Sequence, residues 1–446
     1  MIARMRQSIL RSALPLFLLV AGAASPAQAQ TAAQTRTAQS TLATLADAWV
    51  PMALEIGTFE PDFVDAYYGP EALRKAAEAK PRSRAVLEAA ARAAVARLEK
   101  EVIPHVRDPF ILARAKNLHG FYKAAAMRLA MIGGKRFGFD EEADGLFSVT
   151  LPAFKPLDHY DAILARLETL LPGSGTLAER VDAFGERFVI PKDKLRPVMD
   201  AAIAECRRRT LVWFDLPKEE SFDLEFVTGK SWSGYNYYKG GYHSLIQVNT
   251  DLPVRIGRAV DLGCHEGYPG HHVLNIMIER ELVKRHGFKE YEVNPLYSPQ
   301  SVIAEGSANF GIDLAFPGEE RLAFERDVLF PIAGLDPAQA KALSEVGKAT
   351  EELAGARMTL SKLYIDGKID KPRFLELTQR YQLVGDKRAQ QALAFLEQYR
   401  SYVINYAVGK DMVRDYVERG SPDAKTRWER MRHVLSDMVM PGDLVP

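Results

Sequence analysis

The chain has 446 residues, of which 47% are hydrophobic and 26% charged. Such a length can bury a large core in one domain or in two closely packed ones. Lysine and arginine together number 58, as do aspartate and glutamate. This balance, without any long basic tract, excludes the charge pattern of a nucleic-acid-binding protein or of a surface drawn to anionic lipid.

The first 29 residues are typical of a secretory signal peptide. A basic start, an apolar stretch over 13–24 and the triplet Ala27, Gln28, Ala29 follow one another as such a signal requires. The apolar stretch is shorter than the roughly 20 residues that span a bilayer. We therefore expect a mature chain from about Gln30, periplasmic or secreted, with no stable membrane insertion. An uncleaved membrane anchor is the alternative.

Residues 40–215 have the spacing of helices, with apolar residues recurring at intervals of three and four. The clearest segments are 84–102, 108–132 and 158–171. Asp158 is the predicted N-cap of the third segment, and Gly133 with Gly134 is predicted to end the second. The alanine- and threonine-rich residues 30–41 are expected to form a loose tail before the first helix.

Residues 221–250 differ from their surroundings in being rich in aromatic, glycine and β-branched residues. Alternation in DLEFV (223–227) and SLIQVN (244–249) predicts two or three short strands. An edge strand of this sheet could hold an extended peptide, or the segment could be a purely structural hairpin. Helical spacing returns over 256–440.

Only two cysteines occur, Cys206 and Cys264. They could pair in an oxidising compartment, but two cysteines do not make a disulfide framework in so long a chain. Cys264 directly precedes His265, which suggests a thiolate ligand. Neighbouring helix positions point about 100° apart, so Cys264 is poorly placed to share an ion with His265. We interpret Cys264 as a small buried apolar residue.

A cluster of histidines indicates a metal site. His265, His271 and His272 lie within one short segment, and Glu266 adjoins the first of them. Catalytic zinc sites take three protein ligands and leave a position for water, whose proton a neighbouring carboxylate accepts. In H-E-x-x-H metallopeptidases one helix supplies two histidine ligands and the glutamate base. The pattern predicts one zinc ion, with Glu266 as the general base.

The spacing departs from H-E-x-x-H, because His271 and His272 follow His265 by six and seven positions. In a regular helix, position i+6 is rotated by roughly 240° and position i+7 lies about 10 Å along the axis. The residues that would break the helix are Gly267, Pro269 and Gly270. If two residues loop out, His271 becomes the second ligand and His272 supports the ligands or faces the substrate. The reverse assignment stays open.

A third ligand must come from elsewhere in the chain, and Glu305 is the candidate. It belongs to SVIAEGSANFG (301–311), a segment with the apolar spacing of a half-buried helix. Asn309, one turn later, is expected to hydrogen-bond the carboxylate. The alternative for Glu305 is an ordinary solvated glutamate.

Three segments resemble a known family. CHEGYPGHHVLN (264–275) is similar to the H-E-x-x-P-G-H-H signature of the large bacterial family catalogued as a domain of unknown function, number 885. SVIAEGSANFGIDL (301–314) resembles its later E-G segment, and YRSYVINYAVGKDMVRDYVE (399–418) resembles its C-terminal Tyr-x-x-Gly stretch. The resemblance covers the last half of the mature chain.

The resemblance implies a mostly helical, zincin-like protein and a zinc-dependent peptidase or hydrolase. Carried over position by position, it places five residues in the site, namely His265, Glu266, His271, His272 and Glu305. Residues 307–309 depart from the bulkier, more aromatic residues that usually follow E-G in the family. This departure affects the expected shape of the substrate pocket.

Helical zinc peptidases stabilise the oxyanion with a tyrosine or histidine opposite the metal. The candidate here is Tyr406, with His243 and Tyr242 in reserve. Arg400 could bind a substrate carboxylate through two hydrogen bonds, or it could form a surface salt bridge.

We therefore expect an exported, mainly α metallohydrolase with residues 30–446 in one domain and a small sheet before the metal-binding helix. The expected reaction is hydrolysis of an amide bond in short peptides by metal-activated water, with no nucleic-acid partner. Two alternatives stay open: an esterase or amidase that uses the same metal site on a non-peptide substrate, and a catalytically inactive exported binding protein.

Overall fold

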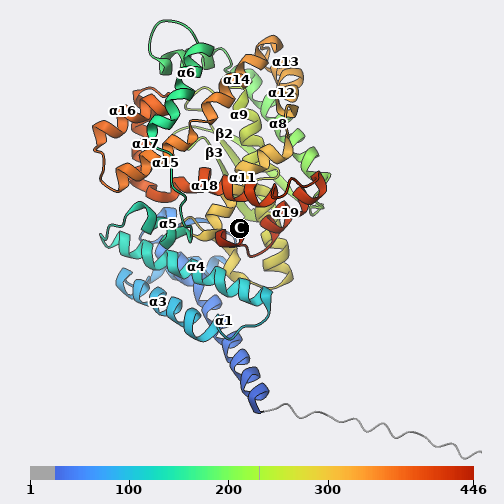
Figure 1. Ribbon diagram of the computed structural model, residues 1–446. Coiled ribbons are helices and arrows are strands. Elements are labelled where there is room, and N and C mark those ends of the chain that lie inside the picture. The colour runs from blue at the N-terminus through green and yellow to red at the C-terminus, as the bar shows by residue number, and fades with distance from the viewer. Residues whose placement is uncertain (1–25, 231, 446) are drawn as a thin grey trace, which may run out of the picture.

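The computed structural model describes residues 26–445 apart from residue 231, with side chains from residue 33 onward. Residues 1–25 of the predicted signal peptide lie outside the described residues. The predicted mainly α class is confirmed, because helices make up most of the described chain and only two small sheets accompany them (Figure 1). None of the helices among the described residues is long and apolar enough to cross a membrane.

The N-terminal part is helical, as predicted. Its elements are α1 (Pro26–Gly57), η1 (Pro61–Phe63), β1 (Val64–Tyr67), α2 (Glu71–Ala79), α3 (Arg84–Arg97), η2 (Leu98–Val102), α4 (Pro109–Ile132), α5 (Phe139–Phe147), η3 (Leu157–Tyr160), α6 (Asp161–Leu170), α7 (Leu177–Glu186) and α8 (Lys192–Leu211). Helices α1, α3 and α4 lie together at one end of the molecule (Figure 1). Their shared core includes Trp49, which stacks on Phe121.

Local sequence signals explain most of these boundaries. The Asp108 side chain accepts a hydrogen bond from the backbone N–H of Ile111 at the start of α4, and Gly133 ends that helix as predicted. Two predictions were wrong. Residues 30–41 belong to α1, because alanine favours helix and Ala38 is buried. Asp158 lies inside the 3₁₀ turn η3 and caps nothing, since α6 begins after that turn.

The strands predicted over 221–250 are present as a three-stranded sheet. The elements of this middle part are β2 (Ser221–Val227), β3 (Gly234–Gly240), β4 (His243–Asn249), α9 (Gly257–Leu262), η4 (Gly263–Gly267), α10 (His271–Ile278), η5 (Glu279–Arg285), η6 (Lys289–Glu292), β5 (Val293–Pro295) and α11 (Pro299–Ala315). The strand order is β2-β4-β3, with β2 and β4 parallel and β3 antiparallel to β4. A second sheet pairs β1 with β5. Strand β3 is therefore an edge strand.

The C-terminal part is helical from end to end. Its elements are α12 (Glu320–Phe324), η7 (Glu325–Leu329), α13 (Phe330–Ala333), η8 (Pro337–Gln339), α14 (Ala340–Glu351), α15 (Ala354–Ile365), α16 (Lys371–Gln382), α17 (Asp386–Tyr399), η9 (Arg400–Val403), α18 (Ile404–Val417), α19 (Ala424–Ser436) and α20 (Pro441–Leu444). Gly367, between α15 and α16, and Ser421, between α18 and α19, have a left-handed backbone.

Helices α11 and α18 cross in close contact at the centre of the molecule (Figure 1). Two glycines make this contact possible, because a Cβ atom on Gly306 would lie 2.4 Å from the carbonyl oxygen of Gly409. A Cβ atom on Gly409 would likewise lie 2.8 Å from the carbonyl oxygen of Val302. These glycines belong to the E-G and Tyr-x-x-Gly segments. The crossing brings Glu305 against Tyr402, which lies on η9 just before α18.

Candidate metal centre

The helix that carries the histidines is interrupted where the glycines and proline predicted a break. Element η4 ends at Gly267, Tyr268 has an extended backbone (φ −127°, ψ 117°), and α10 begins at His271. The N–H of Gly270 donates to the carbonyl oxygen of Cys264 at 3.0 Å. A Cβ atom on Gly270 would lie 1.8 Å from the carbonyl oxygen of His265. Only glycine fits this fold-back.

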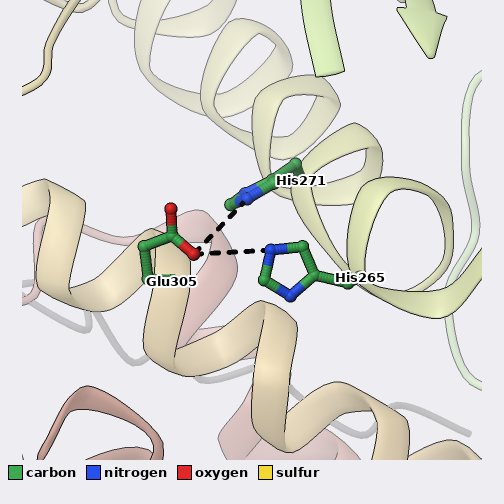
Figure 2. Close-up of side chains that lie close together, drawn as sticks. All are labelled: His265, His271 and Glu305. Atoms are coloured by element: carbon green, nitrogen blue, oxygen red, sulfur yellow. Dashed lines mark ion pairs between the residues drawn. The ribbon is translucent and has the colours of Figure 1, made fainter. Parts of the chain in front are cut away.

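The fold-back brings the side chain of His271 beside that of His265, and α11 presents Glu305 to both (Figure 2). The Oε2 atom of Glu305 is 3.4 Å from Nε2 of His265 and 3.9 Å from Nε2 of His271. The two imidazole centroids are 4.6 Å apart, with the rings nearly perpendicular. The three side chains predicted as ligands therefore form one cluster, in which one ligand atom from each lies within 4.8 Å of the others.

The two histidine distances to Glu305 are longer than hydrogen bonds, and the shorter one matches the separation of two ligands on one zinc ion. Hydrogen bonds from nitrogen to oxygen are about 2.7 to 3.2 Å long, shorter than both histidine distances to Glu305. Two atoms that each lie about 2.1 Å from a tetrahedral zinc ion are roughly 3.4 Å apart. The Oε2 atom of Glu305 is also buried without a hydrogen-bond partner. Two imidazole nitrogens and an orphaned carboxylate oxygen are a donor set that fits zinc.

The other oxygen of Glu305 is held by a residue that the sequence analysis missed. The hydroxyl of Tyr402, on η9, donates to Oε1 at 2.9 Å, and both side chains are buried. Burial would raise the pKa of Glu305, but the two neighbouring histidines and this hydroxyl outweigh burial and lower it. The carboxylate is therefore ionised and fixed in orientation. Tyr402 lies one helical turn before Tyr406, and this spacing in the sequence could have indicated that both tyrosines face the site.

Glu266 lies beside His265 on η4, buried against the edge strand β3. The amide of Asn236 donates to its main-chain oxygen at 2.7 Å, and a Cβ atom on Gly234 would lie 2.8 Å from its Oε1. Burial, with the negative charges of Glu305 and Asp65, raises the pKa of the Glu266 carboxyl to about 7. A carboxyl with this pKa can both accept and return a proton near neutral pH.

Tyr406 borders the cluster, one ring away from Glu305. Its ring centroid is 5.8 Å from that of Tyr402. Burial raises the pKa of its hydroxyl, and the charges of Glu305 and Glu266 raise it further, so the phenol is protonated. This placement is compatible with the predicted role of an oxyanion donor, which stays a prediction.

Two further groups from distant segments border the site. Asp65, on β1, accepts a hydrogen bond from Tyr235 of β3. Burial, together with the charge of Glu305, raises the pKa of the Asp65 carboxyl to about 6. Arg357, on α15, faces the ring of Tyr406. Neither Asp65 nor Arg357 belongs to a motif, so no local pattern in the sequence marks them.

The structure places His272 outside the cluster. Its side chain is fully buried, its Nε2 lies 3.0 Å from Oε2 of Glu220, and its Nδ1 lies 2.7 Å from Oγ of Ser244. Because both ring nitrogens contact residues of the sheet region, the predicted role toward ligands or substrate is wrong. His272 instead anchors α10 to the sheet.

The two reserve candidates for the oxyanion donor also lie away from the cluster. The ring of His243 contacts Ser221 at 3.0 Å and Asp223 at 3.4 Å across the β2–β4 pair. Tyr242 packs under Lys284 and lines a surface hollow of about 590 Å³ that contains none of the cluster residues. Their positions leave Tyr406 as the candidate.

Two other sequence predictions are corrected by the contacts. The amide of Asn309 donates at 2.9 Å to the backbone oxygen of Glu305 and not to its carboxylate, since the side chain reaches back along its own helix. Arg400 donates at 2.5 Å to the fully buried Glu142, so it forms an ion pair, as the alternative had it, but in the interior and not on the surface.

Cys206 and Cys264 form a disulfide, the pairing that the sequence left open, and Cys264 is buried as predicted. The bond joins α8 to the residue before His265 across a sequence separation of 58. The sequence left the pairing open because the distance between two single cysteines depends on tertiary packing. The disulfide fixes the first histidine of the cluster to the scaffold.

Comparisons with known proteins add a fold likeness. No family model and no curated protein matches the chain. A solved structure described as "the putative lipoprotein from Colwellia psychrerythraea" is similar, with a TM-score of 0.50 and 15% sequence identity over 81% of this chain and 68% of that chain. At this identity the likeness concerns the fold alone. The resemblance to the family with domain of unknown function 885 stays a prediction.

Proposed function

We propose that this protein is an exported zinc-dependent hydrolase that cleaves an amide bond in short peptides. The observation that carries the proposal is the buried, unpartnered Oε2 of Glu305, which faces the Nε2 atoms of His265 and His271. A buried carboxylate oxygen without a partner is costly unless a cation completes its surroundings. Glu266 next to this cluster supplies the proton-transfer group that hydrolysis needs.

His265, His271 and Glu305 would hold the zinc ion. When bound, zinc polarises the scissile carbonyl and lowers the pKa of water. Glu266 accepts the proton of the attacking water and later delivers it to the leaving amine. The Tyr406 hydroxyl donates a hydrogen bond to the carbonyl oxygen that gains negative charge. Tyr402 keeps Glu305 ionised and in place.

Export is part of the proposal. The signal-like residues 1–29 support it. The Cys206–Cys264 disulfide supports it as well, because such bonds persist in oxidising compartments.

The test replaces Glu266 by glutamine, which keeps the shape of the side chain but removes its basicity. We expect Glu266→Gln to bind zinc like the wild type while turnover of a mixed peptide library falls by about a hundredfold or more, as loss of a general base implies. Glu225→Gln is the control, because Glu225 is an exposed residue of β2. Wild-type activity in Glu266→Gln would contradict the mechanism. A parallel panel of ester substrates separates peptidase from esterase activity.

A further inference from the structure

Arg357 is a cation on the border of the candidate site. It lies on α15, and its Cζ atom is 5.9 Å from the ring centroid of Tyr406 and 5.7 Å from that of Phe395. The negative charge of Glu305 raises the pKa of the Tyr406 hydroxyl, and the positive charge of Arg357 lowers it. Arg357 therefore contacts the same tyrosine that the charge of the predicted ligand Glu305 reaches.

Arg357 differs from other arginines of the interior in having no acidic partner in the part of the chain that the structure describes. Arg400 pairs with Glu142, Arg128 with Glu60, and Arg321 with both Asp261 and Glu325. For Arg357, burial lowers the pKa of the guanidinium, and only the Tyr406 hydroxyl acts against that effect. Arg357 is half-buried, and a cation that is partly withdrawn from bulk water without a counter-ion is costly.

The contacts of Arg357 do not account for this cost by themselves. Its cation–π contacts with Tyr406 and Phe395 are close to the roughly 6 Å limit at which such contacts count. A guanidinium offers five N–H donors in a planar fork. The Nε atoms of Arg180 and Arg427 are buried without a hydrogen-bond partner, but no nitrogen of Arg357 is. Its donors are therefore open to a ligand.

We propose that Arg357 binds a carboxylate of the substrate, so that the substrates are short peptides with a free C-terminal carboxylate close to the bond that is cut. This proposal rests on the proposed function and names its substrate class. A carboxylate accepts two parallel hydrogen bonds from a guanidinium, which fixes position as well as charge. Because Tyr406 is the proposed oxyanion donor, a carboxylate held by the guanidinium beside its ring would lie close to the scissile bond.

The binding arm of the test does not depend on turnover. The probe is a mixed tripeptide library in two forms, one with free C-terminal carboxylates and one with C-terminal amides, offered to zinc-loaded Glu266→Gln protein. We expect the carboxylate form to bind about tenfold tighter or more, as a charge-assisted pair implies. Adding Arg357→Met should abolish the preference, and adding Arg357→Lys should retain part of it. Arg388→Met, an exposed position on α17, is the matched control.

The turnover arm offers the same two libraries to the wild type and to Arg357→Met, with circular dichroism to verify folding. We expect the wild type to cut the carboxylate form faster and Arg357→Met to lose that difference. Equal use of both forms by the wild type, or a preference that survives in Arg357→Met, overturns the inference while leaving the hydrolase proposal standing. Absence of cleavage with a binding preference that depends on Arg357 refutes the hydrolase and upholds the inference. If Arg357→Met does not fold, Arg357→Lys takes its place, and a full wild-type preference for the carboxylate form in Arg357→Lys overturns the inference.

Discussion

Replacing Tyr402 by phenylalanine tests whether the Tyr402 hydroxyl holds the predicted metal ligand Glu305. The change removes one hydroxyl that donates to Oε1 of Glu305 at 2.9 Å, and leaves the buried ring in place. Hydrogen bonds to a charged group contribute about 1.5 to 3 kcal/mol. Since about 1.4 kcal/mol corresponds to a tenfold change in affinity, the dissociation constant for zinc should rise about ten- to a hundredfold, in the range seen when an outer partner of a metal ligand is removed.

The assay is competition for zinc with a chromogenic chelator at neutral pH. Tyr364→Phe is the matched control, because the Tyr364 hydroxyl donates to Glu397 at 2.7 Å on the surface, away from the cluster. In a Glu305→Gln background, Tyr402→Phe should add little, since the charged acceptor is already gone. Unchanged zinc affinity in Tyr402→Phe would refute the reasoning that this hydroxyl fixes a metal ligand.

Three further predictions follow from local features. Gly270→Ala should destabilise the protein by about 3 kcal/mol or more and abolish zinc binding, because its Cβ would overlap the His265 carbonyl oxygen. Thermal unfolding measures the loss of stability, and the control Gly385→Ala, whose Cβ would meet open space, should unfold like the wild type. Replacing Cys206 and Cys264 together by alanine should lower the free energy of unfolding by about 4 kcal/mol for this loop length, measured in urea. Burial opposes ionisation of Glu220, but hydrogen bonds from His272, Tyr268 and Arg207 outweigh it and lower the pKa to about 2. Its ionisation therefore contributes stability above its ordinary pKa of 4.5 that is lost as pH falls toward 2, about 3 kcal/mol in all. Glu220→Gln should flatten the acid limb of the stability curve, and an unchanged limb would contradict this assignment.

Much of the scaffold could be predicted because it depends on local chemistry. Apolar spacing located α3 and α4, and the glycines and proline after Glu266 predicted the break that brings His271 to His265. The same local reasoning misjudged residues 30–41, where alanine-rich sequence continues as helix once one face is buried.

The rest of the site depends on tertiary contacts that no local pattern encodes. Asp65 and Arg357 come from elements far from the histidines in the chain, and only packing brings Asp65 near Glu305 and Arg357 against Tyr406. The sequence left Arg400 open between a substrate-binding residue and a surface salt bridge, because its partner, the buried Glu142 of α5, is distant in the chain. His272 has the same chemistry as His271, and only the direction of the first turn of α10 separates a candidate ligand from an interior anchor.

The central claim is that His265, His271 and Glu305 bind a single divalent cation. Elemental analysis of the full-length protein, purified without added metal, measures this directly beside the Glu305→Gln variant. The account predicts about one zinc ion per wild-type chain, as for a three-ligand zinc site, and a metal-depleted Glu305→Gln. A wild type that carries no zinc and acquires none on reconstitution, or a variant that retains the full zinc content, would contradict it.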